Sequence, residues 1–333
     1  MKILVTGAGG FIGSHVLKRL MTLRVDSVGV DNFSNYYSSK YKHIRLKEIG
    51  IQKDIQVLNC NLAVFDEIDN LVSKYKPNYI IHLAAQAGVR LSLSQTNLYI
   101  DTNVCGFQNL IRSAIENHVD GIIYASSSSV YGDSSSIPYK EDMQILRPKS
   151  IYGVTKLSNE LFAEIQSKDS KLRFRGLRFF TVYGPWGRPD MAYFKLAAAA
   201  LGQGRFNLFG DGSIKRDFTY IDDVVESTIS LCTDLASRKE GFSDLVNIGG
   251  GRPLEMNYLI ELISDRGDFE IDILKSPESP LDSRITVADN SYLQSIIGAK
   301  SFTNLEEGVA RLMDWAKREE IKSSLLSWIS SVG

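Results

Sequence analysis

A tyrosine and a lysine stand four residues apart in the stretch SIYGVTK, as Tyr152 and Lys156. On a helix this spacing places both side chains on one face. A tyrosine with its ordinary pKa of about 10 is a poor base at neutral pH, but a nearby ammonium favours the phenolate and lowers the pKa of the phenol. The pair indicates a proton-transfer site, and an ordinary amphipathic helix is the alternative that the spacing alone leaves open.

Four consecutive serines, residues 126–129, follow the apolar run GIIYA upstream of this pair. A serine run is typical of a linker or a loop. Here it comes directly after residues typical of a buried strand, so it predicts hydroxyl groups held at a strand end as one wall of an active site. The sequence assigns no role to Ser126.

A glycine-rich turn, VTGAGGFIGSH, places Gly7, Gly10 and Gly13 between the first apolar run and the first helical pattern. Glycine permits a tight turn and a close approach of backbone to a pyrophosphate, whose charge a helix N-terminus stabilises. Asp31 follows the second apolar run, where a carboxylate binds an adenosine ribose and repels a 2′-phosphate. A glycine motif alone is weak evidence, but this strand–turn–helix context predicts an NAD site.

The composition of the 333-residue chain is that of an ordinary globular protein, with 44% hydrophobic and 23% charged residues. A net charge of −1 predicts neither a nucleic-acid partner nor attraction to anionic lipid. The cysteines, Cys60, Cys105 and Cys232, are too far apart for a disulfide framework or a common zinc site, so we expect a cytoplasmic protein without a metal. The apolar start, MKILVTG, is too short for a signal peptide or a membrane span.

Short apolar runs alternate with helical patterns through the first part of the chain, at 2–7, 27–32, 55–62, 79–86, 121–127 and 173–184. Strands of this kind are buried on both faces, which predicts an α/β fold with a Rossmann-type, doubly wound parallel sheet. After residue 184, Gly-, Pro- and charge-rich loops separate the helical stretches. We expect residues 1–184 to form mainly the NAD-binding domain with the catalytic residues. Residues 185–333 would form mainly a smaller substrate-binding lobe, interleaved with the last strands.

Two further strand ends are expected at the same edge of the sheet as the glycine loop. Asn61 ends the third apolar run, and HLAAQAG, residues 82–88, ends the fourth. At this edge they are expected to line the adenine and the nicotinamide riboside. His82 lies between Ile81 and Leu83, so we interpret it as a packed strand residue and not as a catalyst.

The order of these features, a glycine loop, an aspartate, a hydroxyl-rich strand end and YxxxK, resembles the extended short-chain dehydrogenase/reductases along nearly the whole chain. The resemblance implies that Ser127 hydrogen-bonds the reacting hydroxyl, that Tyr152 moves its proton, and that Lys156 holds the NAD ribose and tunes the tyrosine. It also implies a tightly bound NAD that is regenerated in each turnover. The implied cofactor-binding residues are Gly7, Gly10, Phe11, Ile12, Gly13, Asp31, Asn32, Asn61, Leu62, Leu83, Ala84, Ala85, Gln86, Asn103, Tyr152, Lys156 and Phe180.

The second half resembles the nucleotide-sugar branch of that family. The segments RFFTVYGPWGRPDM, LFGDGSIKRDFTYIDDVV and LDSRITVAD match stretches that bind a nucleoside diphosphate sugar in this branch. By resemblance Arg216 binds the diphosphate, and a guanidinium fork suits that geometry. A surface ion pair with Asp217 or Asp223 is the alternative for this arginine.

Ser128 and Ser129 distinguish among the reactions of the branch. Relatives that dehydrate the sugar carry Asp-Glu at these positions, and relatives that decarboxylate UDP-glucuronate carry a glutamate at the second. This chain has no extra acid or base there. The resemblance therefore implies 4-epimerisation, in which C4 is oxidised, the keto sugar rotates, and the hydride returns to the other face.

Among the epimerases, the chain is most similar to UDP-glucuronate 4-epimerases, in the stretches DNFSNYY, AAQAGVR, SSSSVYG and TVYGPWGRPDM. UDP-galactose epimerases usually have asparagine where this chain has Thr181. The similarity implies a UDP-hexuronate whose carboxylate meets hydroxyl and guanidinium donors. The implied substrate-binding residues are Arg90, Ser127, Ser128, Ser129, Tyr152, Thr181, Arg188 and Arg216. Gly153 stands where this group commonly has alanine, and glycine lowers helix propensity.

Two alternatives stay open. One is a 4-epimerase of neutral or N-acetylated UDP-hexoses. The other is a non-catalytic NAD-sensing protein on the same fold, although such proteins tend to lose the tyrosine or the lysine. The resemblance further implies a homodimer through the helices at 101–118 and 150–166.

Overall fold

The computed structural model describes residues 1–52, 56–89, 93–134, 136–202, 204–279 and 283–330. Within these residues, the largest sheet has seven parallel strands. Their order is β10 (Ser243–Ile248), β6 (Arg173–Phe179), β5 (Gly121–Ser127), β4 (Tyr79–His82), β1 (Lys2–Thr6), β2 (Asp26–Asp31) and β3 (Val57–Asn59). The run from β3 to β6 follows the Rossmann order, so the predicted fold class is confirmed.

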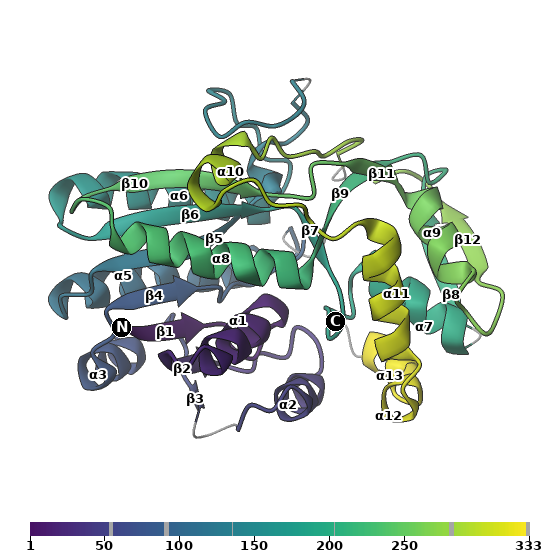
Figure 1. Ribbon diagram of the computed structural model, residues 1–333, viewed down its shortest axis with the longest axis horizontal. Coiled ribbons are helices and arrows are strands. Elements are labelled where there is room, and N and C mark those ends of the chain that lie inside the picture. Colours follow the sequence, from purple (N-terminus) through teal and green to yellow (C-terminus); the bar gives the residue numbers. More distant parts are fainter. Residues whose placement is uncertain (53–55, 90–92, 135, 203, 280–282, 331–333) are drawn as a thin grey trace.

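Helices flank this sheet on both faces (Figure 1). In the first part of the chain they are α1 (Phe11–Thr22), α2 (Ser39–Glu48), α3 (Phe65–Tyr75), α4 (Thr96–Tyr99), a π-helical segment (Ile100–Cys105), α5 (Gly106–Glu116), a 3-10 turn (Ser128–Val130) and α6 (Ile151–Asp169). The second part of the chain forms α7 (Ala192–Gly202), α8 (Ile221–Ala236), α9 (Met256–Ser264), α10 (Ser291–Ile297), α11 (Leu305–Ala316), α12 (Glu319–Lys322) and α13 (Leu325–Ser330). Of these, α8 lies against the main sheet, while α7, α9, α11, α12 and α13 lie in the lobe described below (Figure 1). None of the helices in the described residues has the length and apolar character needed to span a bilayer.

Alternate residues of the strands pack into opposite apolar layers. Ile3 and Val5 of β1 belong to the layer that also holds residues of α1 and α8. Leu4, between them, belongs to the layer that also holds residues of α3, α5 and α6. Figure 1 shows α1 and α8 on one face of the sheet, with α5 and α6 on the other. Burial on both faces explains why the strands are continuous apolar runs in the sequence.

A lobe lies beyond the carboxyl ends of the main strands (Figure 1). It contains two small sheets, one of β7 (Thr181–Tyr183), β9 (Lys215–Tyr220) and β11 (Pro253–Glu255), the other of β8 (Arg205–Phe209) and β12 (Asp272–Ser276). The apolar run at 173–184 is therefore two strands in two sheets. The run divides at Phe180, whose N–H donates to the carbonyl of Ile248 at 3.1 Å. α8 and β10 then bring the chain back to the main sheet.

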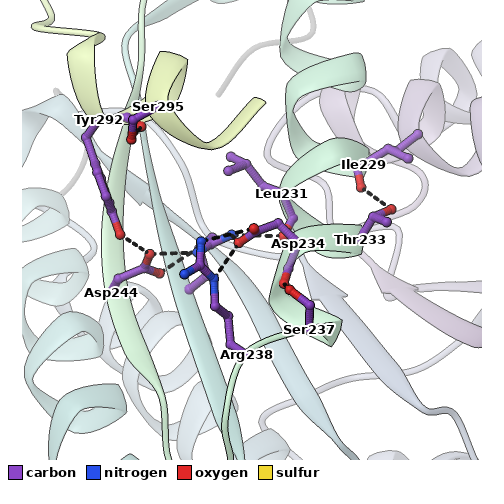
Figure 2. A network of polar contacts seen from close by, with 10 residues as sticks. Ile229, Leu231, Thr233, Asp234, Ser237, Arg238, Asp244, Tyr292 and Ser295 are labelled. Carbon is purple, nitrogen blue, oxygen red and sulfur yellow. Dashed lines mark hydrogen bonds and ion pairs between the residues drawn. The ribbon is translucent and has the colours of Figure 1, made fainter. Parts of the chain in front are cut away.

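An ion cluster joins β6 to elements of the second half on the α8 side. Arg175 is fully buried and donates to both carboxylate oxygens of Asp244 at 2.8 Å and to Asp234 at 2.7 Å. Figure 2 shows Arg238 bonded to Asp234, and Tyr292 bonded to Asp244. We call these five residues the outer ion cluster. It ties α8, β10 and α10 to one strand of the sheet.

Candidate active site

A cavity of about 1140 Å³ lies at the carboxyl ends of the main strands and extends to the lobe. Many of the predicted site residues line it: Gly7, Gly10, Phe11, Ile12, Gly13, Asp31, Asn32, Asn61, Leu62, Leu83, Ala84, Ala85, Gln86, Ser127, Ser128, Ser129, Tyr152, Lys156, Phe180, Thr181, Arg188 and Arg216. Asn103 lies behind the cavity wall, fully buried, where its amide bonds to Gln86 and Thr155. Arg90 lies outside the described residues.

The glycine loop is packed too tightly for side chains. Gly7 has a φ of 70°, and a Cβ there would stand 2.6 Å from the backbone nitrogen of Ala84. A Cβ on Gly13 would stand 2.1 Å from the carbonyl oxygen of Gly7. α1 begins at Phe11 without a side-chain cap, so its first N–H groups remain available to an anion. These residues fit the pyrophosphate of NAD.

Asp31 ends β2 with its carboxylate fixed by backbone donors. Its Oδ2 accepts from the N–H of Gly9 at 3.0 Å, and its Oδ1 accepts from the N–H of Phe33 at 2.7 Å. Lys42 of α2 lies 3.8 Å from Oδ1 and also lines the cavity. The carboxylate is therefore held where a ribose hydroxyl group is bound in this type of fold. The sequence reasoning missed Lys42, because nothing in its spacing points to Asp31.

Arg45 of α2 supports the glycine loop and was also missed. It is fully buried, and it donates from Nη1 to the carbonyl of Gly9 at 2.8 Å and from Nε to the carbonyl of Trp186 at 2.9 Å. The arginine thus ties the loop to the segment that follows β7. Its partners are distant in the sequence, so no local pattern identifies it.

Tyr152 and Lys156 share one face of α6, as their spacing predicted, and both line the cavity with Ser127 from the end of β5. Ser127 is near enough to the hydroxyl of Tyr152 to act as a hydrogen-bonding group that lowers the pKa of this phenol. Lys156 is fully buried, with its Nζ 5.9 Å from the centroid of the tyrosine ring. This Nζ donates to the carbonyl of Ala125 at 2.8 Å. One helix and one strand end therefore bring the three groups together.

The protonation states of these groups are set mainly by burial. Burial raises the pKa of Tyr152, while the charge of Arg188 and the hydrogen bond with Ser127 act in the opposite direction. Burial lowers the pKa of Lys156 to about 8, and the charge of Glu160 opposes this effect. The expected net lowering of the phenol's pKa is wrong for the protein's own groups, because desolvation of a phenolate outweighs the charges around it.

Gly153 lets α6 approach the serine run. A Cβ at this position would stand 2.8 Å from the carbonyl oxygen of Ser129 and 2.8 Å from the Cβ of Pro148. The helix is stabilised at its start by Ser150, whose side chain accepts from the N–H of Gly153 at 3.1 Å. The glycine therefore has a packing role that offsets its low helix propensity.

Ser126 lines the cavity beside Ser127 and belongs to a buried polar network that joins β5 to α6. Its hydroxyl donates to Glu160 of α6, which also accepts two hydrogen bonds from Arg178 of β6, at 2.9 and 2.8 Å. Arg178 donates to the hydroxyl of Tyr131, which donates to Asn247 at 2.7 Å. We call these five residues the inner ion cluster. The serine without a predicted role thus joins the strand to the helix.

Hydroxyl groups form the wall next to Ser127. Ser128 and Ser129 lie in the 3-10 turn that follows β5, and the N–H of Ser129 donates to the Ser127 Oγ at 3.1 Å. Thr181, at the start of β7, lines the same cavity. These side chains offer neutral hydrogen bonds to a ligand.

Arg188 is held at the cavity by a carboxylate that the sequence reasoning missed. Its Nε donates to Asp190 at 3.0 Å, and its Nη2 donates to the second oxygen of the same residue. Tyr36 also donates to Asp190, at 3.1 Å, and its ring lies under the guanidinium at 5.7 Å. The hydrogen bonds among the described residues use Nε and one N–H of Nη2, so N–H groups of Nη1 and Nη2 can donate to a ligand.

The lobe contributes Arg216 and β8 to the cavity. Arg216 donates from Nη1 to the carbonyls of Ser283 at 2.6 Å and Lys215 at 3.0 Å. Its neighbour Asp217 is turned to other partners, the N–H groups of Ala288 at 2.8 Å and Gly251 at 3.1 Å. Sequence reasoning missed the lining strand β8, because its short run RFNLF stands between glycines and looks like a loop.

His82 is confirmed as a packed strand residue. It is fully buried, its Nδ1 lies 2.8 Å from the hydroxyl of Thr6, and its ring stacks on Phe107 at 5.2 Å. Burial lowers the pKa of His82 to about 3, and the charge of Lys156 acts in the same direction. The imidazole is therefore neutral at physiological pH.

The chain is similar to known proteins along nearly its full length. It is 38% identical over 328 residues to Protein CapI of Staphylococcus aureus, covering 95% of this chain and 98% of that protein. It is 36% identical over 330 residues to a probable UDP-glucuronate 4-epimerase of Rhizobium meliloti, covering 95% and 96%. The solved structure of UDP-glucuronic acid 4-epimerase from Bacillus cereus, in complex with UDP-glucuronic acid and NAD, matches with a TM-score of 0.86 at 31% identity, covering 95% and 99%.

A family model matches residues 3–249, a range that contains the glycine loop, Ser127, Tyr152, Lys156 and Arg216. The match therefore includes both the predicted cofactor loop and the groups suited to proton transfer. With this model and these relatives in agreement, the chain belongs to the NAD dependent epimerase/dehydratase family.

Proposed function

We propose that this protein is an NAD-dependent 4-epimerase that interconverts UDP-glucuronate and UDP-galacturonate. The observation that carries the proposal is that one cavity is lined by a proton-transfer group, Ser127, Tyr152 and Lys156, and by donors suited to a carboxylate. The relatives named above support the same substrate, because two of them are named for UDP-glucuronate or UDP-glucuronic acid.

In the proposed reaction, Tyr152 accepts the proton of the substrate's 4-hydroxyl group while Ser127 hydrogen-bonds the same oxygen. Burial raises the pKa of Tyr152 and opposes this base form, while the charge of Arg188 and the hydrogen bond with Ser127 favour the phenolate. The Lys156 ammonium stabilises the phenolate through its positive charge. The glycine loop and Asp31 would hold NAD, which would supply the hydride acceptor and donor for C4. Tyr152 then returns its proton to the C4 oxygen.

The acids of the cavity favour epimerisation over elimination. Among the described residues that line it, the carboxylates are Asp31 and Asp190. Asp31 accepts backbone hydrogen bonds at the glycine loop, and Asp190 is occupied by Arg188 and Tyr36. Elimination of water needs a further acid and base beside the sugar, and neither carboxylate is placed to serve as one.

The substrate carboxylate is assigned to Ser128, Ser129, Thr181 and Arg188. The 4-keto intermediate of a uronate is a β-keto acid, which tends to lose CO₂. Several donors fix the carboxylate, so the breaking C–C bond stays out of line with the carbonyl π system. They also stabilise the localised charge of the carboxylate more than the delocalised charge of the decarboxylation transition state.

We assign the two ends of the cavity to the two parts of the chain. Residues 1–184 would bind NAD mainly through the loop, Asp31 and the strand ends. Residues 185–333 would hold the UDP portion, with Arg216 on the diphosphate. The guanidinium is fixed by two backbone carbonyls and faces the cavity, which supports this role.

The proposal is tested by chromatography of products formed from UDP-glucuronate by the purified protein. UDP-galacturonate is the expected product. A UDP-pentose as the main product, or no turnover, would overturn the proposal. Parallel assays with UDP-glucose and UDP-N-acetylglucosamine identify the alternative epimerase, and turnover that persists in Tyr152→Phe would contradict the catalytic assignment.

The substrate carboxylate has its own test in Arg188→Ala. This change is expected to reduce turnover of UDP-glucuronate by about tenfold or more, and to affect UDP-glucose much less. The neutral sugar serves as the internal control for damage to the site. Equal losses with both sugars would remove Arg188 from the carboxylate subsite.

A homodimer is also part of the proposal. Apolar side chains remain exposed on α6, with Leu161 at 53% and Ile165 at 56%, and on the neighbouring segment at Leu98 and Ile100. An exposed apolar helix face suits an isologous interface with a second copy. Light scattering is expected to give the dimer mass, and Leu161→Asp to give the monomer mass. A monomeric wild-type protein would contradict this.

We further propose a cytoplasmic location. The three cysteines are unpaired, and Cys105 is exposed, which suits a reducing compartment. Fractionation of cells is expected to recover the protein with cytoplasmic markers. Recovery in an exported fraction would contradict the assignment.

A further inference from the structure

Glu160 is the centre of the inner ion cluster and lies one helical turn after Lys156. It is 5% exposed, and its carboxylate accepts from Arg178 through both oxygens and from the hydroxyl of Ser126. Lys156 donates to the carbonyl of Ala125 at 2.8 Å. α6 thus holds two consecutive residues of β5 directly before the catalytic serine.

We propose that Glu160 is a positioning residue for the epimerisation proposed above, on which this inference rests. Through Ser126 it fixes the strand end that carries Ser127 against the helix that carries Tyr152, and it lies one helical turn after Lys156. Glu160 itself is not among the described residues that line the cavity. It therefore acts through its neighbours and not on the substrate.

The surroundings of Lys156 give this charge its importance. Burial lowers the pKa of Lys156 to about 8, and Glu160 is the group that raises it. Other titratable side chains on nearby elements are His82 on β4, Tyr99 on α4, Asp101 and Cys105 on the π-helical segment, Tyr124 on β5, Glu141 before α6, Arg178 on β6 and Asp244 on β10. His82 and Tyr124 are kept neutral by burial, and Asp101 and Cys105 are exposed. Glu141 accepts from the N–H of Asn247, and Asp244 is held by Arg175.

The decisive variant is Glu160→Gln, with Asp244→Asn as its matched control. Each change neutralises a carboxylate that a buried arginine of β6 holds through two hydrogen bonds, but Asp244 lies in the outer ion cluster (Figure 2). Glu160→Gln is expected to lower kcat with UDP-glucuronate about tenfold, with KM nearly unchanged. It is also expected to move the alkaline limb of the kcat profile about one pH unit lower. Asp244→Asn is expected to lower Tm and to leave the limb in place.

Two further variants separate charge from position. Glu160→Asp keeps the charge but shortens the side chain, so kcat is expected to fall while the alkaline limb stays in place. Ser126→Ala removes the contact with the strand, and kcat is expected to fall about threefold at constant KM. An unmoved limb in Glu160→Gln, or an equal shift in Asp244→Asn, would overturn the inference. If Glu160→Gln does not fold, an unchanged kcat in Ser126→Ala would overturn it.

Other substrates and a measurement without substrate distinguish failure of the Glu160 proposal from failure of the proposed function. If the wild-type protein does not convert UDP-glucuronate, the same variants are compared with UDP-glucose and UDP-N-acetylglucosamine. Thermal unfolding against pH needs no substrate. Because the folded pKa of Lys156 is about 8 and its ordinary value is 10.5, the wild type gains stability from this group between those pH values. In Glu160→Gln the gain is expected to begin at a lower pH, and an unchanged onset contradicts the inference whatever the substrate.

Discussion

The outer and inner ion clusters are both built around a buried arginine of β6, yet they join different parts of the molecule. Arg175 and Arg178 are three residues apart, so their side chains leave the strand on opposite faces. Arg175 is bonded to residues of α8 and β10, and Arg178 to residues of β5 and α6 by way of Glu160. In both clusters, the arginine donates two hydrogen bonds to one carboxylate.

The elements that each cluster joins decide what the pairing can influence. Among the described residues that line the cavity, none belongs to α8, β10 or α10. The inner cluster instead bonds to β5 and α6, whose Ser127, Tyr152 and Lys156 line it. We therefore expect the outer cluster to act on stability alone and the inner cluster to act on chemistry as well.

The largest effect is expected on the inner side, from Lys156→Met. Loss of the ammonium is expected to reduce kcat by about 10²–10⁴-fold, because the tyrosine loses the charge that stabilises its phenolate. Stability at neutral pH is expected to rise by about 1–3 kcal/mol, since burial of the ammonium is unfavourable. Steady-state kinetics and denaturant unfolding measure the two quantities. Lower stability with retained turnover in this variant would contradict the expectation that only the inner side of the sheet influences the chemistry.

On the outer side, Arg175→Met is expected to lower the free energy of unfolding by about 3 kcal/mol. The change leaves Asp244 without its arginine, while Asp234 keeps Arg238. The kcat of the folded protein is expected to stay within about twofold of the wild type. Urea unfolding and kinetics below the transition provide the measurement. A tenfold fall in kcat would show that the outer cluster reaches the site.

Lys156, beside the inner cluster, and Asp234, in the outer cluster, are expected to respond at opposite ends of the pH range. Because the pKa of Lys156 is about 8, kcat is expected to fall about tenfold per pH unit above that value as the ammonium is lost. The arginines beside Asp234 hold its pKa below the ordinary value, although burial opposes them. Its contribution to stability is therefore present at neutral pH and lost as the pH falls through the folded pKa. Profiles of kcat and Tm against pH test both limbs.

The smallest effect is expected from Tyr292→Phe, which removes one hydrogen bond at the rim of the outer cluster. Tyr292 donates to Asp244 at 2.8 Å from an exposed position on α10 (Figure 2). The expected loss is about 0.5–1 kcal/mol of unfolding free energy, with kcat and KM unchanged. Tm measurement at neutral pH detects it. A loss as large as that of Arg175→Met would make the tyrosine, and not the arginine, the main support of α10.

The sequence predicted those features that depend on local pattern. The glycine loop, Asp31 and the YxxxK pair follow from spacing and context, and the apolar runs predict a sheet buried on both faces. The pairing of Ser126 with Glu160 was not predictable, because the partners are 34 residues apart and meet only through the sheet. Asp190 was missed for a different reason, since an acidic residue beside an arginine is common on surfaces.

The structure corrects the expected pKa of Tyr152 and refines the expected strand at residues 173–184. The pKa of Tyr152 depends on burial, which the spacing of its neighbours does not report. The run at 173–184 is continuously apolar, so its division at Phe180 becomes visible only from the hydrogen bond with Ile248. Local patterns thus located the chemical groups, while long-range contacts set their energetics.

The position of β10 has a consequence for how specificity can be transplanted between relatives. This strand comes from the second half of the chain and pairs in register with β6, Val246 opposite Leu177. A chimera with a single junction near residue 184 would import a foreign edge strand into the seven-stranded sheet. A graft that leaves α8 and β10 with the recipient requires more than one junction. Exchange of substrate preference between relatives with this architecture therefore requires the transfer of several separate segments, and one continuous segment does not suffice.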